Sequence, residues 1–106
     1  MNNDVVAPDL PRPGHVFRIY LAGESPNSMR ALANLYAICR RHYPSSHRID
    51  IIDVLKDSQS ALAESIFVTP TVVKLSPAPV VHIIGNLSDE PEVLRALGLP
   101  QELLTV

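Results

Sequence analysis

The run Val16–Ala22 constrains the fold of this chain more than any other segment. It is rich in β-forming residues and apolar on both faces, with only Arg18 as an interruption. A strand of this kind has to be covered on both sides, so the run predicts a central strand of a sheet. A helix follows at once: Ser25 can cap its N-terminus, Pro26 suits its first position, and apolar residues recur at helical spacing as far as Tyr43.

Strands and helices continue to alternate along the rest of the chain. The same signals predict a strand at Ile49–Leu55, a short helix at Gln59–Ile66, strands at Thr69–Leu75 and Val80–Ile84, and a last helix between a Ser88 cap and Gly98. The second strand is apolar enough to be internal, and the crossover makes it parallel to the first. The last two strands are close enough in sequence to pair as an antiparallel hairpin. This order, β-α-β-α-β-β-α with a mixed four-stranded sheet, is the α/β arrangement of thioredoxin-like folds.

The chain length of 106 residues predicts one domain, and 46% hydrophobic residues are sufficient for a packed core. We expect residues 1–14 to be a flexible leader, residues 15–99 to be the domain and residues 100–106 to be a C-terminal tail. The formal net charge of −2 argues against a nucleic acid or an anionic membrane as a partner. Neither a signal sequence nor an apolar run near the roughly 20 residues of a membrane helix is evident, so we expect a cytoplasmic protein.

The single cysteine, Cys39, excludes an intramolecular disulfide, a paired-cysteine redox site and a thiolate-rich zinc site. It lies on the apolar stripe of the first predicted helix, which indicates a small buried hydrophobic residue. The four histidines are scattered without the spacing of a metal site, and we expect them in loops or facing solvent. These residues predict no metal centre.

In thioredoxin-like folds the active site lies where the first strand passes into the first helix, because the helix N-terminus lowers the pKa of a cysteine there. In this chain the segment is Ser25-Pro26-Asn27-Ser28. A serine hydroxyl has too high a pKa for a helix N-terminus alone to activate it, and no nearby His or Lys is evident as a base. Thr69-Pro70 fits the proline, usually cis, that precedes the third strand. The residues therefore predict this fold without redox chemistry, catalytic residues or a cofactor.

An enzymatic alternative would use Ser25 at the helix N-terminus, as a stress-related glutathione-binding or transferase-like domain. Such transferases carry a second helical domain, for which 106 residues leave no room. This alternative predicts that glutathione perturbs the protein.

Four segments of the sequence resemble, in the same order, the signature motifs of the KaiB family. Phe17–Leu32 is similar to a strand ending in YVAG followed by TPNSxRAL, and Ile51–Asp57 is similar to VIDVLKNP. Val68–Val72 resembles ATPTL, and Val81–Asp89 resembles RRIIGDLSD. The resemblance covers about residues 15–99 of the chain.

The resemblance implies a non-enzymatic clock or clock-like regulator. Members of the family bind a KaiC-type ATPase, and they compete there with a sensor histidine kinase whose N-terminal domain is thioredoxin-like. In the full clock they also sequester KaiA. A stand-alone thioredoxin-like sensor or adaptor module in two-component signalling would bind the same ATPase without sequestering KaiA, and the sequence leaves both functions open.

The resemblance also implies two folds: a self-associated, tetrameric ground state with a rearranged C-terminal half, and a thioredoxin-like monomer that binds the partner. Pro70, Pro77 and Pro79 give a physical reason, because X–Pro isomers differ by about 1 kcal/mol or less in an unfolded segment. Asn86 stands in place of the family's aspartate, Val81-His82 replaces its basic pair, and its acidic tail is missing. These departures favour the thioredoxin-like form as the resting state.

The candidate site residues are polar or charged positions within the matching motifs. We expect partner contacts at Asn27, Arg30, Lys56, Asp57 and Lys74. Candidates for a structural switch or for the cis-proline are Thr69, Pro70, Gly85 and Asn86. The alternative for each partner-contact residue is a solvated surface position, because most surface charges have no partner.

Overall fold

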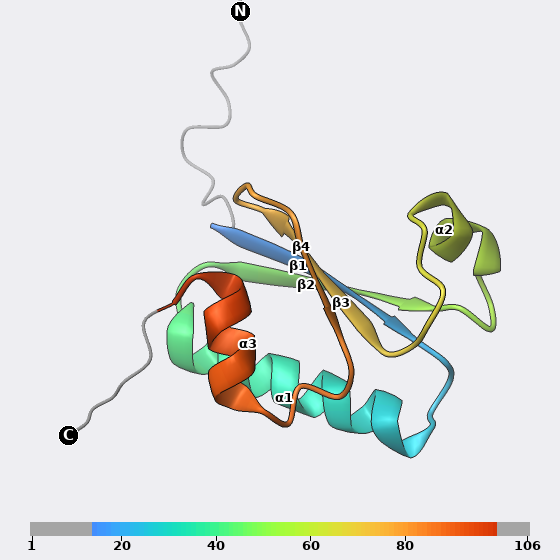
Figure 1. Ribbon diagram of the computed structural model, residues 1–106, viewed down its shortest axis with the longest axis horizontal. Helices are drawn as coiled ribbons and strands as arrows, with labels where there is room; N and C mark the ends of the chain where they lie inside the picture. The colour runs from blue at the N-terminus through green and yellow to red at the C-terminus, as the bar shows by residue number, and fades with distance from the viewer. Residues whose placement is uncertain (1–13, 100–106) are drawn as a thin grey trace, which may run out of the picture.

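Seven elements follow one another in the predicted order in a computed structural model that describes residues 14–99 (Figure 1). They are β1 (His15–Leu21), α1 (Pro26–His42), β2 (His47–Asp53), α2 (Ser58–Ala63), β3 (Thr71–Ser76), β4 (Val81–Ile84) and α3 (Glu90–Leu97). The predicted bounds differ from these at the element ends. The expected leader, apart from Gly14, and the expected tail lie outside the described residues.

The strands form one sheet in the order β2-β1-β3-β4, in which β1 is parallel to β2 and antiparallel to β3. β4 pairs antiparallel with β3, which confirms the predicted hairpin and the mixed four-stranded sheet. The prediction that the second strand is internal is wrong, because β3 occupies the other side of β1 and leaves β2 at the edge. The exposed Arg48 and half-buried Asp50 alternate with isoleucines along β2, as suits a strand with only one neighbour.

Local capping sets the helix ends. Ser25 caps α1 as predicted, and Gly98 ends α3 in the left-handed conformation at φ 78°. The predicted cap of the last helix is wrong by one residue, because Asp89 caps α3 by accepting the N–H of Glu92 at 3.4 Å. Ser88 instead donates its N–H to the Asn86 side chain at 3.0 Å, so the chain is still in a turn at that residue.

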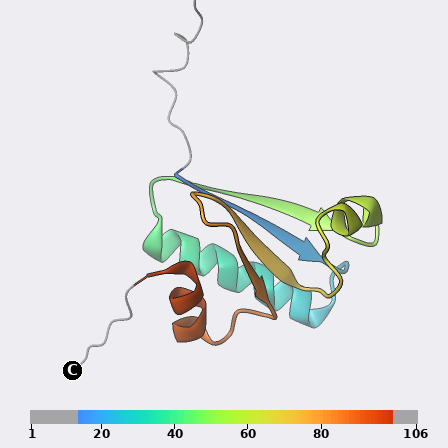
Figure 2. The same cartoon turned by 45° about the horizontal axis from the view of Figure 1, so that its top comes forward.

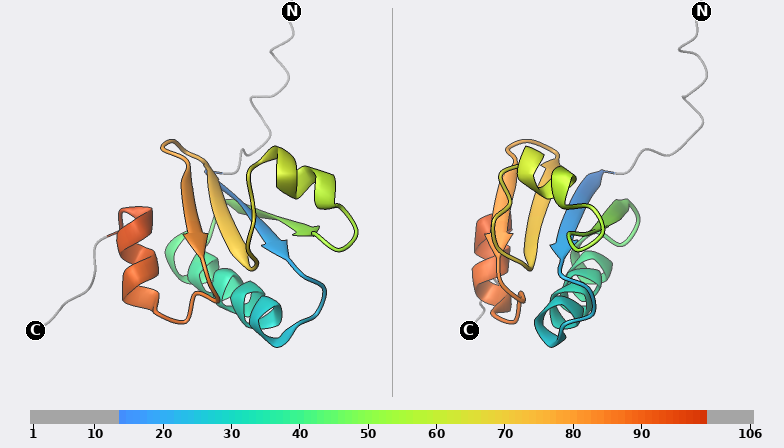
Figure 3. Two further views of the ribbon diagram at one scale, coloured as in Figure 1. Left: turned by 45° about the vertical axis from the view of Figure 1, so that its right-hand side comes forward. Right: turned by 90° about the vertical axis from the view of Figure 1, so that its right-hand side faces the viewer.

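Buried side chains form one cluster on each face of the sheet. The larger cluster lies on the face covered by α1 and α3 (Figure 2). Its members include Phe17, Ile19, Leu35, Cys39, Val72, Val93 and Leu94. The smaller cluster lies on the other face, where α2 covers one end (Figure 3). It consists of Tyr20, Ala61, Ile66 and Val73.

Cys39 is completely buried in the larger cluster, as predicted. The prediction that the histidines lie in loops or face solvent is correct for His82 and wrong for the other three, which are half-buried in α1, β1 and β2. The ring of His15, for example, stacks on Tyr43 with 3.8 Å between centroids, so an aromatic neighbour covers it. Within residues 14–99, no helix is long and apolar enough to cross a membrane.

Candidate functional site

The turn from β1 into α1 holds two serine hydroxyls in contact. Ser25 Oγ accepts the N–H of Ser28 at 3.3 Å, and the Ser25 hydroxyl donates to Ser28 Oγ at 2.9 Å. Ser28 is 1% exposed and also accepts the N–H of Ala22 at 3.1 Å. The pair therefore satisfies backbone groups at the helix start, and it contains no thiol or base for redox or nucleophilic chemistry.

The segment that enters β3 lies beside the segment that leaves β4. The Thr69–Pro70 peptide bond is cis, the geometry expected of the proline at this point of the fold. The buried Pro70 accepts the N–H of Gly85 at 3.0 Å through its carbonyl. Gly85 has φ 116°, which residues with a side chain rarely adopt. Three of the four candidate switch residues, Thr69, Pro70 and Gly85, are therefore adjacent at this end of the sheet.

An amide cluster joins the start of α1 to the loop after β4. Asn27 Oδ1 accepts hydrogen bonds from Arg30 Nη1 at 3.0 Å and from Asn86 Nδ2 at 3.4 Å. Asn34 donates to the Asn86 carbonyl at 2.8 Å. The structure thus brings together three predicted site residues and adds Asn34, which the sequence did not predict as a site residue. The feature of the sequence that could have indicated Asn34 is its polar side chain beside the apolar stripe of the first helix.

The loop from β2 to α2 reaches the same end of the molecule. Asp53 ties it to the β1–α1 turn, because its Oδ1 accepts the N–H of Gly23 at 3.0 Å. Asp57 caps α2 by accepting the hydroxyl of Ser60 at 2.7 Å and its N–H at 3.1 Å, and these bonds lower the pKa of the Asp57 carboxyl. Lys56 is exposed. Asp57 therefore has a structural role here, and the Lys56 ammonium is accessible to a partner.

Lys74 lies apart from the other candidates. It is opposite Phe17 in the β1–β3 register, so its side chain extends from the face of the sheet that carries the larger cluster. It is 5% exposed, and Nζ donates to the Pro77 carbonyl at 2.6 Å. The ammonium is therefore not on the molecular surface in this structure.

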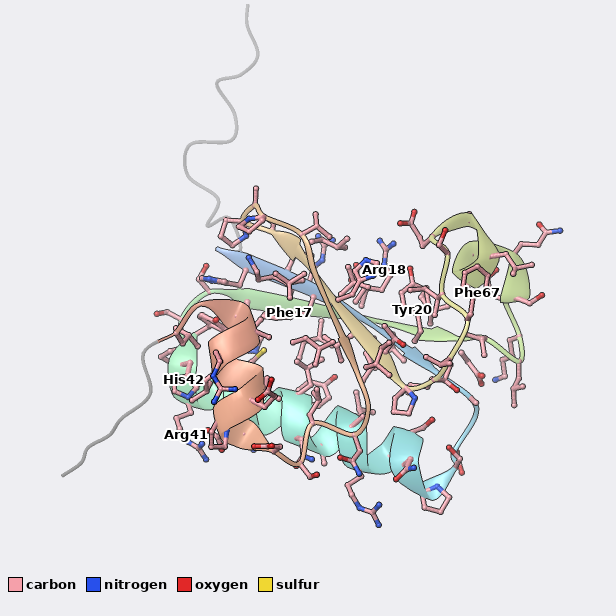
Figure 4. All side chains as sticks on the ribbon, in the orientation of Figure 1. Phe17, Arg18, Tyr20, Arg41, His42 and Phe67 are labelled. Atoms are coloured by element: carbon pink, nitrogen blue, oxygen red, sulfur yellow. The ribbon has the colours of Figure 1, made fainter. Side chains whose placement is uncertain are left out.

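An exposed apolar surface, which we call the α2 patch, consists of Leu62, Phe67 and Val68. These side chains are 62%, 77% and 49% exposed and line an open groove of about 270 Å³ together with Thr69. Figure 4 shows Phe67 beside α2, on the part of the molecule away from α3. The sequence did not predict this patch, because the apolar residues before Pro70 fit a buried helix end equally well. A contiguous exposed apolar patch indicates an interaction surface.

The arrangement suits recognition of a protein surface. Amide groups, an accessible ammonium and the α2 patch occupy one end of the molecule. Among residues 14–99, no three His, Cys, Asp or Glu side chains are grouped so that they could hold a metal ion. The groups that lie at this end offer hydrogen bonds, charge and apolar contact.

A family model described as the KaiB domain matches residues 18–99. The chain belongs to the KaiB family. The circadian clock oscillator protein KaiB of Prochlorococcus marinus strain MIT 9211 is 42% identical to it over 90% of this chain and 83% of the relative. The circadian clock protein KaiB3 of Synechocystis strain PCC 6803 is also 42% identical, over 86% of this chain and 89% of the relative.

The resemblance to the KaiB family implied two folds, a thioredoxin-like one and one with a rearranged C-terminal half. Solved structures show which of the two this chain has here. The N-terminal domain of Synechococcus elongatus SasA superposes with a TM-score of 0.68 at 17% identity, covering 97% of this chain and 100% of that domain. Mitochondrial thioredoxin 3 of Saccharomyces cerevisiae superposes with a TM-score of 0.64 at 17% identity, covering 82% and 80%. The KaiB-family chain is therefore thioredoxin-like here, without the rearranged C-terminal half of the alternative.

Proposed function

We propose that this KaiB-family protein is a non-enzymatic clock or clock-like regulator that binds a KaiC-type ATPase and modulates its phosphorylation and output cycle. The observation that carries the proposal is family membership, with relatives named as circadian clock proteins that match over most of their length. The serine pair at the β1–α1 turn agrees with a role that involves no redox chemistry. This function requires no cofactor.

We place the ATPase contact at the end of the molecule that carries the α2 patch, Lys56, Asn27 and Arg30. Exposed aromatic side chains often dominate the energy of an interface, and Phe67 is 77% exposed. Asp57 would act through the start of α2, which it caps. Lys74 would take part only after its ammonium leaves the Pro77 carbonyl.

Further partners belong to the same proposal. A sensor histidine kinase with a thioredoxin-like domain would compete for the ATPase, because both proteins would present the same loops of one fold. KaiA would bind only where the host has it. The structural likeness to SasA is one of fold, so it does not favour the stand-alone signalling module over a KaiB-type role.

Co-elution with the KaiC-type ATPase from the same source, in ATP and in ADP, tests the proposal. We expect a nucleotide-dependent complex that Phe67→Ser and Lys56→Glu each weaken by about tenfold or more. Arg40→Glu is the matched control, because Arg40 is exposed on α1 near its other end. No complex in either nucleotide after hours of incubation would contradict the proposal. Chemical-shift changes on adding glutathione would support the enzymatic alternative.

We also propose that the thioredoxin-like arrangement is the one that binds the ATPase, while the C-terminal half can adopt a second packing. The Gly85 N–H, which donates to the Pro70 carbonyl, reports on this arrangement. We expect slow hydrogen exchange at Gly85 in the complex. Fast exchange there, together with a rearranged amide spectrum of residues 65–99, would contradict this part of the proposal.

A further inference from the structure

Three titratable side chains and a buried lysine lie at the end of the sheet where β1 begins. His15 precedes Phe17 by two residues on β1, so both side chains extend from the face that carries the larger cluster. Lys74 is opposite Phe17 on β3 and extends from the same face. Tyr43 is the C-cap of α1, and His47 is opposite His15 in the β1–β2 register. This end of the sheet is the one away from the candidate site.

The Lys74 ammonium is buried without an opposite charge. The residue is 5% exposed, and its Nζ donates to the carbonyl of Pro77, in the turn between β3 and β4, at 2.6 Å. None of the ion pairs among residues 14–99 includes Lys74 or His15. A buried charge without a counterion is costly unless hydrogen bonds compensate it. The position of this ammonium is therefore sensitive to a further positive charge nearby.

His15 is held in place more firmly than Lys74. Its ring stacks on Tyr43 with 3.8 Å between centroids and 21° between planes, and its backbone N–H donates to the Ser46 carbonyl at 3.2 Å. Burial raises the pKa of the Tyr43 hydroxyl, and it raises the pKa of the Cys39 thiol to about 11, so both groups stay neutral. A protonated imidazole is also attracted to an aromatic ring. The Lys74 ammonium, on its flexible four-carbon stem, is therefore the group that can move.

His47 is the remaining titratable group beside His15. Its Nδ1 lies 2.7 Å from the Tyr43 carbonyl oxygen, so this nitrogen carries the hydrogen of the bond and the ring is tied to the end of α1. Burial is the main cause that lowers the pKa of His15, and the nearby Lys74 ammonium lowers it further. A neutral His15 is therefore compatible with the buried ammonium, whereas a protonated His15 repels it.

We propose that His15 and Lys74 form a pH-dependent switch that controls the turn between β3 and β4. While His15 is neutral, the Lys74 ammonium stays on the Pro77 carbonyl and holds the turn against the larger cluster. Protonation of His15 places a second cation beside the buried ammonium, and the Lys74 side chain then turns out to the surface. The inference goes beyond the proposed function and concerns the free protein.

The lowered pKa of His15 sets the direction of the switch. The unfolded chain binds this proton more tightly than the folded one, so the contribution of neutral His15 to stability is present above the ordinary histidine pKa of 6.5. That contribution is lost as the pH falls below 6.5 and through the lower pKa of the folded state. Lys74 is therefore inside at neutral pH and is released in mild acid.

Nuclear magnetic resonance of the full chain over the range of histidine titration, about pH 5 to 8, tests the switch. Chemical shifts of the His15 ring report its protonation, and nuclear Overhauser contacts between the Lys74 side chain and Pro77 report whether the ammonium is inside. We expect these contacts to disappear with the midpoint at which His15 gains its proton. In His15→Phe, which keeps a ring on Tyr43 but cannot take a proton, they should persist. His82→Phe is the matched control, because His82 is exposed on the other face of the sheet, and it should leave the transition unchanged.

Lys74→Met gives a second test that does not need the His15 variant to fold. It removes the ammonium and keeps an unbranched stem, so the pKa of His15 should rise towards 6.5. An unchanged His15 pKa in Lys74→Met, or Lys74–Pro77 contacts that persist after His15 is protonated, would overturn the proposal. The same loss of contacts in His15→Phe would also overturn it, because His47 keeps its titratable ring in that variant. The test contains no ATPase, so its result is independent of the proposed function.

Discussion

At the scale of single residues, Ser28 connects two segments of the candidate site. Its hydroxyl is buried, contacts the Ser25 hydroxyl and accepts the N–H of Ala22, so it joins the end of β1 to the first turn of α1. A polar group at 1% exposure is tolerated because its hydrogen-bonding capacity is used. The residue therefore positions the loop that carries Asn27.

Ser28→Ala should lower the free energy of unfolding by about 1–2 kcal/mol, because the Ala22 N–H loses its acceptor. Urea denaturation monitored by circular dichroism measures the change. Ser58→Ala serves as the control, since Ser58 is an exposed α2 residue, and it should stay within about 0.5 kcal/mol of the unsubstituted protein. Equal losses in the two variants would show that the buried hydrogen bonds contribute nothing specific.

At the scale of elements, an ion pair connects the end of α1 to the start of α3. Arg41 pairs with Glu90, and His42 Nε2 lies 3.6 Å from the same carboxylate oxygen (Figure 4). Cations at the C-terminus of one helix and an anion at the N-terminus of the other also suit both helix dipoles. The Arg41 hydrogen bond is the main cause that lowers the pKa of Glu90. The contact stabilises the packing of α3 on α1.

A lowered Glu90 pKa makes this contribution depend on pH with a defined sign. It is present above the ordinary carboxyl pKa of 4.5 and is lost as the pH falls below that value. Arg41→Gln should therefore reduce stability at pH 7 by no more than about 1 kcal/mol, since the pair is partly exposed, and should have a smaller effect at pH 3. Urea midpoints at the two pH values measure this, with Arg40→Gln as the control. The same deficit at both pH values would contradict the linkage.

At the scale of the whole molecule, the two faces of the sheet are covered unequally. α1 and α3 bury the larger cluster, while α2 covers only one end of the other face (Figure 1). The α2 patch therefore stays exposed next to a small core. Stability and partner contact should depend on different parts of the molecule.

Leu35→Ala and Phe67→Ala separate these two parts. Leu35 is 1% exposed in the larger cluster, so its truncation should cost about 2–5 kcal/mol of unfolding free energy. Phe67 is 77% exposed, so its truncation should cost less than about 1 kcal/mol and yet weaken the ATPase complex. Chemical denaturation and co-elution provide the two readouts. A large stability loss in Phe67→Ala would indicate a structural side chain in place of an interaction surface.

Local sequence patterns were sufficient to predict the order of elements and the helix ends at Ser25 and Gly98. They also predicted the proline that enters β3 and the burial of Cys39. Each of these depends on contacts within a few residues or on one apolar stripe, so each can be predicted from the sequence by itself. The family motifs could also be recognised from the sequence by itself, because each motif is a contiguous segment.

Only the tertiary structure decided which strand is at the edge, which side of the sheet Lys74 starts from, and which side chains of the α2 patch stay exposed. Asn34 joins the site through a hydrogen bond to Asn86, a residue 52 positions away in the chain. Periodicity shows which face of an element is apolar, but it does not show what covers that face. The position of β2 was set by β3 pairing with the other side of β1, a contact between distant segments that no local pattern contains.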